Sequence, residues 1–234
     1  MDLYLVRHGL STWNLAGRWQ GGSDPELARE GRRQAVATAA FFAAHAIWEK
    51  VRITALYSSP LQRAWHTARH LGQALALDPQ PVEGLREMAG GVVEGLTEAE
   101  QQARYPQLLT AWQNPDDPDF GWPGGETRRV FAARCIRTLT TICARHAPDD
   151  GLIVVTHGGV IQAYLSGAGL DDPAGSLSYE ADNCGITHIH FAATPTVNGP
   201  PPATVGCVMM FNHRAHLPPV AAPAPRRPGL AVIR

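Results

Sequence analysis

Short apolar runs alternate along this chain with longer segments whose apolar residues recur at helical spacing. The runs are rich in Leu, Ile, Val and Tyr, which predicts buried strands over 2–6, 54–58 and 152–156. The 3.6-residue period predicts helices over 26–45, 61–76 and 126–147, and another directly after 157. This alternation favours an α/β fold, a three-layer α/β/α sandwich whose mostly parallel central sheet carries helices on both faces.

The remaining segments predict smaller elements. Residues 80–83 are expected to form a short strand, and 186–192 and 204–211 two late strands that pair. Thr97 followed by Glu100 is typical of a capping box that starts a short helix. Residues 114–125 contain three prolines and three glycines, which indicates a surface loop.

The chain is expected to hold one domain over 1–217 and a tail over 218–234. Its 234 residues are enough for one sizeable core. The Pro-, Ala- and Arg-rich tail cannot bury enough apolar surface to fold alone.

Composition excludes several classes of function. A net charge of −1 does not favour nucleic acid as a partner. No apolar run approaches the roughly 18 residues that span a bilayer, and no signal pattern opens the chain, so we expect no membrane contact. The chain has four cysteines, Cys135, Cys143, Cys184 and Cys207, and they lack metal-binding spacing. This spacing argues against a zinc site and against a disulfide framework, so we expect a cytoplasmic protein. The oligomeric state is not determined, and a dimer stays open.

Polar groups that suit an anion follow three of the predicted strands. The first strand ends in Arg7-His8, the second precedes a helix with Arg63 in its first turn, and the third ends at His157. Ligands of open α/β sheets bind at the carboxyl ends of the strands. Guanidinium groups and helix N-termini both favour phosphate oxygens, so the sequence predicts a pocket for a phosphoryl group.

With these motifs in place, the chain resembles the histidine phosphatase superfamily, the phosphoglycerate mutase-like fold, from about residue 3 to 217. Each motif is short, but their order and spacing together are specific. The matching segments are Arg7-His8-Gly9, Ser11–Asn14, Gln20-Gly21 with Asp24, Ser58–Ala64, Leu85–Glu87, Glu94–Leu96, Pro123–Glu126, His157–Ile161 and Asn183–Thr187.

The resemblance implies a phosphatase that works through a phosphohistidine. His8 would be the nucleophile, and it must be neutral to attack. Nearby guanidinium groups would lower its pKa. Glu87 would protonate the leaving oxygen and then activate the water that hydrolyses the phosphohistidine.

The resemblance also implies how the phosphoryl group is held. Cationic and imidazole groups would stabilise the equatorial oxygens: Arg7, Arg63 and His157. Further substrate contacts would come from Asn14, Gln20, Gly21 and Gly158. No metal and no other cofactor is implied, and the partner would be a small phosphorylated metabolite. His66 and His70 lie four residues apart, but no third zinc ligand is evident.

Two other functions stay open at this point. A phosphoglycerate mutase would use the same phosphohistidine but must enclose its intermediate. Mutases of the family carry a longer insertion after the catalytic Glu, so the 38 residues between Glu87 and Glu126 favour hydrolysis. A catalytically retired phosphate-binding module is the third reading, although each expected catalytic group is present.

The chain also departs from the family pattern near the expected acid. Gly90 and Val93 stand where the family has bulkier residues, so we expect looser packing there. Four aromatic residues, two in the loop after His8 and two in the long insert, are either plain core or part of the substrate mouth, and both interpretations stay open: Trp13, Trp19, Phe120 and Trp122.

Overall fold

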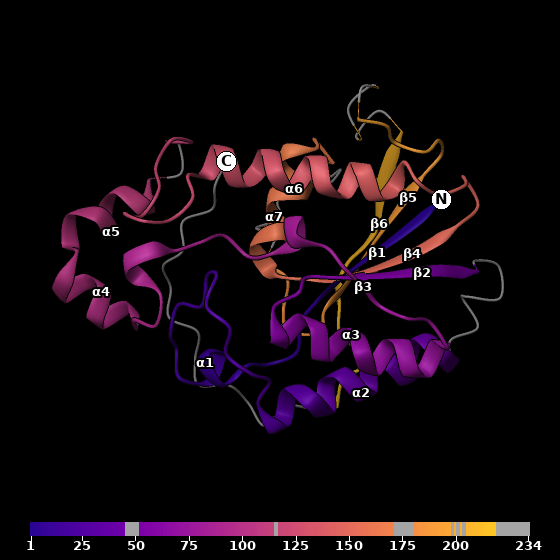
Figure 1. Ribbon diagram of the computed structural model, residues 1–234, viewed down its shortest axis with the longest axis horizontal. Helices are drawn as coiled ribbons and strands as arrows, with labels where there is room; N and C mark the ends of the chain where they lie inside the picture. Colours follow the sequence, from indigo (N-terminus) through magenta and orange to yellow (C-terminus); the bar gives the residue numbers. More distant parts are fainter. Residues whose placement is uncertain are drawn as a thin grey trace.

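Six strands form one central sheet in the computed structural model, which describes residues 1–44, 52–114, 117–170, 180–197, 199, 202 and 205–218. The strands are β1 (Asp2–Arg7), β2 (Ile53–Ser58), β3 (Gln80–Pro81), β4 (Gly151–Thr156), β5 (Ile186–Phe191) and β6 (Gly206–His213). Their order in the sheet is β3-β2-β4-β1-β5-β6 (Figure 1). The first four in this order are parallel, while β5 runs antiparallel to β1 and to β6.

The register of the three central strands sets the position of the site. Arg7 of β1 lies opposite Thr156 of β4, and Val155 lies opposite Ser58 of β2. The residues that follow these strands therefore emerge at the same edge of the sheet. The predicted convergence of the three strand ends is confirmed by this register.

Helices cover both faces of the sheet, so the expected three-layer architecture is confirmed. The helices α2 (Arg29–Ala44) and α3 (Gln62–Leu75) pack on one face, and α6 (Arg128–Cys143) and α7 (Gly158–Gly167) on the other (Figure 1). The helix α2 begins three residues later than the pattern predicted. Three predicted parts lie outside the described residues: the last residue expected for α2, part of the strand expected at 204–211, and the tail beyond residue 218.

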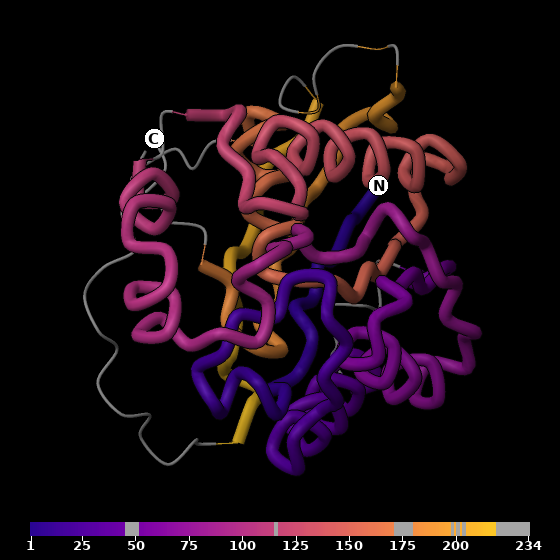
Figure 2. Tube along the Cα trace, turned by 60° about the vertical axis from the view of Figure 1, so that its left-hand side comes forward, coloured from indigo at the N-terminus to yellow at the C-terminus, as the bar shows by residue number. Residues whose placement is uncertain are grey.

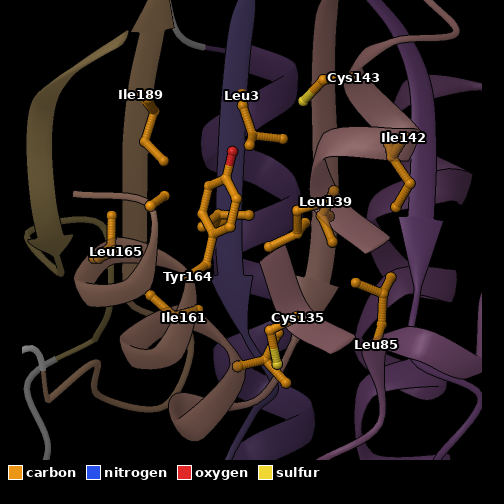
Figure 3. Close-up of a cluster of buried hydrophobic side chains, with 14 of the residues drawn as sticks. Leu3, Leu85, Cys135, Leu139, Ile142, Cys143, Ile161, Tyr164, Leu165 and Ile189 are labelled. Carbon is orange, nitrogen blue, oxygen red and sulfur yellow. The ribbon is translucent and has the colours of Figure 1, made fainter. Parts of the chain in front are cut away.

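Alternation along β1 explains why both faces are covered. Leu3 and Leu5 belong to the core under α6 and α7, and Tyr4 and Val6 belong to the core under α2 and α3. Figure 3 shows the first of these cores, with Leu3 of the central strand near Tyr164 of α7. None of the described helices is long and apolar enough to cross a membrane.

A helical insert lies between Glu87 and α6. It contains α4 (Glu98–Arg104), which starts at the predicted Thr97–Glu100 capping box, and α5 (Pro106–Gln113), which we did not predict. Together with α1 (Thr12–Leu15), the insert lies at the carboxyl end of the parallel strands (Figures 1 and 2).

Aromatic packing inside this insert corrects two expectations. Residues 117–125 are irregular, but they do not form a plain surface loop, because Trp122 is only 1% exposed. It packs in a third apolar cluster with Phe120, Val93 and Trp19. The packing near the expected acid is also not loose, since a Cβ on Gly90 would lie 2.6 Å from Nε1 of Trp19. The missing side chain at position 90 leaves room that this indole fills.

Candidate active site

His8 follows β1 directly and is almost fully buried. Its amide donates to the carbonyl of Thr156 on the neighbouring strand (2.9 Å), which continues the sheet pairing past the strand end. Its Nδ1 lies 2.7 Å from the Gly9 carbonyl oxygen. Because a carbonyl can only accept, Nδ1 carries the proton and Nε2 keeps its lone pair. The local backbone thus selects the nitrogen that is able to attack.

The surroundings of His8 keep its ring neutral. Burial lowers its pKa well below the usual 6.5, and the charges of Arg63 and Arg7 lower this pKa further. A neutral imidazole with a free Nε2 lone pair is the form that a nucleophile needs.

Arg63 lies in the first turn of α3 and is fully buried. Its guanidinium donates from Nη1 to the carbonyl of Ser23 (2.7 Å) and from Nη2 to the carbonyl of Gly21 (2.9 Å). Its Nε has no hydrogen-bond partner among the described residues. Burial lowers the pKa of Arg63 to about 10, so the group stays charged at neutral pH. A buried cation with a donor left over fits an anionic ligand.

Arg7 is fixed by the turn that precedes β5. Its Nη1 donates to the carbonyl of Ala181 (2.6 Å). Cys184 donates its amide back to the Arg7 carbonyl (3.0 Å), and Asn183 Nδ2 donates to the carbonyl of His8 (3.0 Å). Cys184 adopts a left-handed conformation (φ 56°), which lets this turn approach the end of β1. The late Asn183–Thr187 motif therefore braces both residues.

His157 is the N-cap residue of α7 and is fully buried. The centroid of its ring lies 5.2 Å from that of His8. Its Nε2 lies 2.8 Å from Oγ of Ser59, which itself accepts from the amide of Leu61 (3.3 Å). The Ser59 hydroxyl proton is then free to donate to Nε2, so we assign the ring proton to Nδ1. This Nδ1 has no partner among the described residues.

The ring of His157 is neutral for the same reasons as that of His8. Burial lowers the pKa of His157 well below 6.5, followed by the charge of Arg63. Ser59 is a residue of this site that sequence reasoning missed. It lies within the matched Ser58–Ala64 segment, but nothing in that segment indicates which of the serines contacts an imidazole.

Glu87 lies in the irregular segment after β3, opposite the start of α7. Its Oε1 accepts from the amide of Met88 (2.9 Å), and its Oε2 from the amide of Gly159 (3.1 Å). These two amides hold the carboxyl group in place at the start of α7. Gly158, directly before, is the first residue of the same helix. The carboxylate also interacts electrostatically with the Arg63 guanidinium.

Three further predicted residues, Asn14, Gln20 and Gly21, lie in the loop after His8. Asn14 accepts at Oδ1 from the Ser11 amide (3.0 Å) in a capping box that opens α1. The Ser11 hydroxyl donates to Oε1 of Gln20 (2.7 Å). Gly21 contributes the carbonyl that accepts from Arg63. These bonds order the loop from the end of β1 to the first turn of α3.

Glu94 holds this loop against the insert. Its Oε1 accepts from the amides of Gly22 and Gly90, both at 2.8 Å, and its Oε2 from the Ser23 hydroxyl. Both carboxylate oxygens of Glu94 therefore accept hydrogen bonds that stabilise the loop. No group of three or more His, Cys, Asp or Glu side chains in the described part of the chain could hold a metal ion.

The profile of the histidine phosphatase superfamily (branch 1) matches residues 3–197, so the chain belongs to this superfamily. It is 36% identical over 165 residues to a metal-independent phosphoserine phosphatase of Arabidopsis thaliana, covering 69% of this chain and 66% of the relative. It is 35% identical to a glucosyl-3-phosphoglycerate phosphatase of Mycobacterium tuberculosis, covering 73% of this chain and 76% of the relative.

Solved structures agree with these sequence matches. The native structure of mycobacterial glucosyl-3-phosphoglycerate phosphatase aligns with a TM-score of 0.75 at 29% identity, covering 91% of this chain and 99% of that one. The expected superfamily and fold are confirmed, and the chain is a histidine phosphatase.

Proposed function

We propose that this phosphatase hydrolyses a small phosphomonoester through a phosphohistidine formed on Nε2 of His8. One observation carries the proposal. His8 is buried, neutral and bonded through Nδ1 to a carbonyl, so its other nitrogen keeps a lone pair close to the charges of Arg63 and Arg7.

In the first step, Nε2 of His8 attacks phosphorus and the bond to the ester oxygen breaks. Glu87 delivers a proton to the departing alkoxide, which leaves as an alcohol. The equatorial oxygens gather charge in this transition state. Arg7, Arg63 and the Nδ1 proton of His157 stabilise that charge, and no change of protonation state is needed from them.

In the second step, a water molecule attacks the phosphohistidine. Glu87 accepts the proton of this water, the bond between phosphorus and Nε2 breaks, and inorganic phosphate forms. His8 returns to its neutral state, and Glu87 regains the proton that it gave up. In this proposal Asn14 adds a neutral donor to the phosphoryl group, and Gln20, Gly21 and Gly158 supply further substrate contacts.

The substrate is a small phosphorylated metabolite such as phosphoserine or glucosyl-3-phosphoglycerate. These are the compounds for which two of the related phosphatases are named. The short insert supports hydrolysis over phosphoryl exchange, because 38 residues between Glu87 and Glu126 offer little chain to enclose an intermediate.

The test is a panel of small phosphomonoesters, including these two, scored by kcat/KM for phosphate release. Isomerisation of 2- and 3-phosphoglycerate is measured in parallel, with and without 2,3-bisphosphoglycerate. We expect phosphate release to dominate for at least one metabolite. Fast isomerisation with negligible phosphate release would identify a mutase and overturn the proposal.

The state of the cysteines supports a cytoplasmic location. All four are free thiols, and three of them are buried. Free thiols of this kind persist in reducing compartments.

A further inference from the structure

An ion pair between Arg134 and Glu126 contacts the segment that carries Glu87. Arg134 of α6 donates from Nε to Oε1 of Glu126 (2.9 Å) and from Nη2 to Oε2 (2.6 Å). The two side chains are 23% and 22% exposed, so the pair is partly shielded from water. Glu126 belongs to the matched Pro123–Glu126 motif, which takes no part in the proposed chemical steps.

This pair also binds the backbone on both sides of Glu87. Arg134 Nη1 donates to the carbonyls of Gly84 (2.9 Å) and Arg86 (2.8 Å). On the other side, Glu126 Oε2 accepts from the amide of Ala89 (3.1 Å). Backbone groups three and one residues before Glu87, and two residues after it, are thus fixed to one rigid bidentate pair.

We propose that Arg134 and Glu126 are positioning residues for Glu87, an inference that rests on the role proposed above for this carboxylate. Their bonds fix the segment from Gly84 to Ala89, and thereby the distance from the Glu87 carboxylate to the leaving oxygen. Proton transfer depends steeply on such distances, and a displacement of about 1 Å can cost roughly 100-fold in rate.

Loss of the pair is expected to move this segment and leave the rest of the fold in place. The freed carbonyls belong to residues of intermediate exposure, so water can replace the guanidinium. Leu85, next to them, is anchored independently, because its carbonyl accepts from the Thr156 hydroxyl (2.8 Å). The phosphate-binding groups stand on other elements, so they keep their geometry.

The experiment compares Arg134→Met with a matched control, Arg129→Met. Arg129 also lies on α6 and forms a bidentate pair, with Asp119 at 2.7 and 2.9 Å, but that pair is exposed, and the Arg129 guanidinium bonds to Asp119 instead of to the backbone around Glu87. Each variant is assayed with aryl phosphates that span a range of leaving-group pKa values, alone and combined with Glu87→Gln.

We expect Arg134→Met to lower kcat/KM by roughly 10- to 100-fold for the poorest leaving groups, and much less for the best ones, as lost acid catalysis predicts. The inhibition constant of inorganic phosphate should stay within about 2-fold, since the phosphate-binding groups do not move. Combined with Glu87→Gln, the same substitution should cost almost nothing more, because the carboxyl group it positions is already gone. The Arg129→Met control should match the unmodified enzyme.

Equal losses with and without Glu87→Gln would overturn the positioning role while leaving the role of Glu87 intact. Uniform slowing of all leaving groups by Glu87→Gln itself would overturn the proposed acid. If Arg134→Met does not fold, Glu126→Gln and Arg134→Lys take its place in the same comparison. Lys retains the charge but cannot reproduce the fork that reaches both carbonyls and the carboxylate.

Discussion

The Ser59 hydroxyl lies 2.8 Å from Nε2 of His157, and this contact determines which nitrogen of the ring carries its proton. The Leu61 amide donates to the same hydroxyl oxygen, so the serine proton is directed to the imidazole. A neutral His157 is then a donor at Nδ1, the nitrogen that the proposed mechanism uses to bind a phosphoryl oxygen.

We expect Ser59→Ala to lower kcat/KM by roughly 10-fold, because without the hydroxyl the ring is free to adopt the wrong tautomer. Nitrogen-15 NMR of the His157 ring should report mixed tautomers in the variant and protonated Nδ1 in the parent enzyme. Ser58→Ala is the control, since the Ser58 hydroxyl donates to the Ser59 carbonyl and does not contact the ring. An unchanged His157 spectrum in Ser59→Ala would contradict the assignment.

His8→Ala should abolish turnover of a generic aryl phosphate while the fold persists. The substitution removes the attacking nitrogen, and the phosphate-binding groups left behind cannot form the covalent intermediate. Phosphate release and the thermal unfolding midpoint should be measured together. Rapid-quench labelling should find acid-labile phosphate on the parent enzyme and none on the variant. Normal turnover by the variant would refute the nucleophile.

Gly159→Ala should impair the acid without destabilising the protein. A Cβ at this position would overlap the Glu87 carboxylate, which is the end of a flexible side chain and can move away. We expect kcat/KM for poor leaving groups to fall by roughly 10-fold or more, with little change in the unfolding midpoint. The control repeats Gly159→Ala in the Glu87→Gln background, where the acid is already lost and the added Cβ should cost little more. Equal losses in the two backgrounds would contradict this view of Glu87.

The two buried imidazoles predict that stability falls as the pH is lowered. His8 and His157 both have pKa values held well below 6.5 in the folded state, by burial and then by Arg63. The unfolded chain binds these protons near pH 6.5 and the folded chain does not, so the free energy of unfolding decreases below that pH. Each group contributes up to about 1.4 kcal/mol per pH unit.

Urea unfolding of the parent enzyme and of His8→Asn at pH 7, 6 and 5, in phosphate-free buffer, measures this effect. The variant should lose one of the two contributions and show a shallower dependence on pH. Other titrating groups are common to both proteins and cancel in the difference. Parallel dependences would mean that folded His8 takes up its proton as readily as the unfolded chain does.

The amino-acid sequence was sufficient to predict the central sheet and the convergence of its strand ends. Apolar runs that stop at Arg7-His8 and at His157 are local signals, and the rule for ligands of parallel sheets places them together. The roles of these side chains stay predictions. The contact between Ser59 and His157 was not predictable, because it joins residues 98 positions apart through the register of two strands. The burial of Trp122 escaped prediction for a similar reason, since prolines and glycines around it dominate the local pattern.

The aromatic cluster of the insert has a consequence for how such enzymes diverge. Leu109, Phe120 and Trp122 pack against one another within the insert, whereas the proposed catalytic groups other than Glu87 stand on strand ends and helix starts. Replacements on the outer side of α4 and α5 are therefore expected to leave the proposed phosphoryl-transfer residues in position. The insert can then vary in sequence while the chemistry carried by the sheet stays the same.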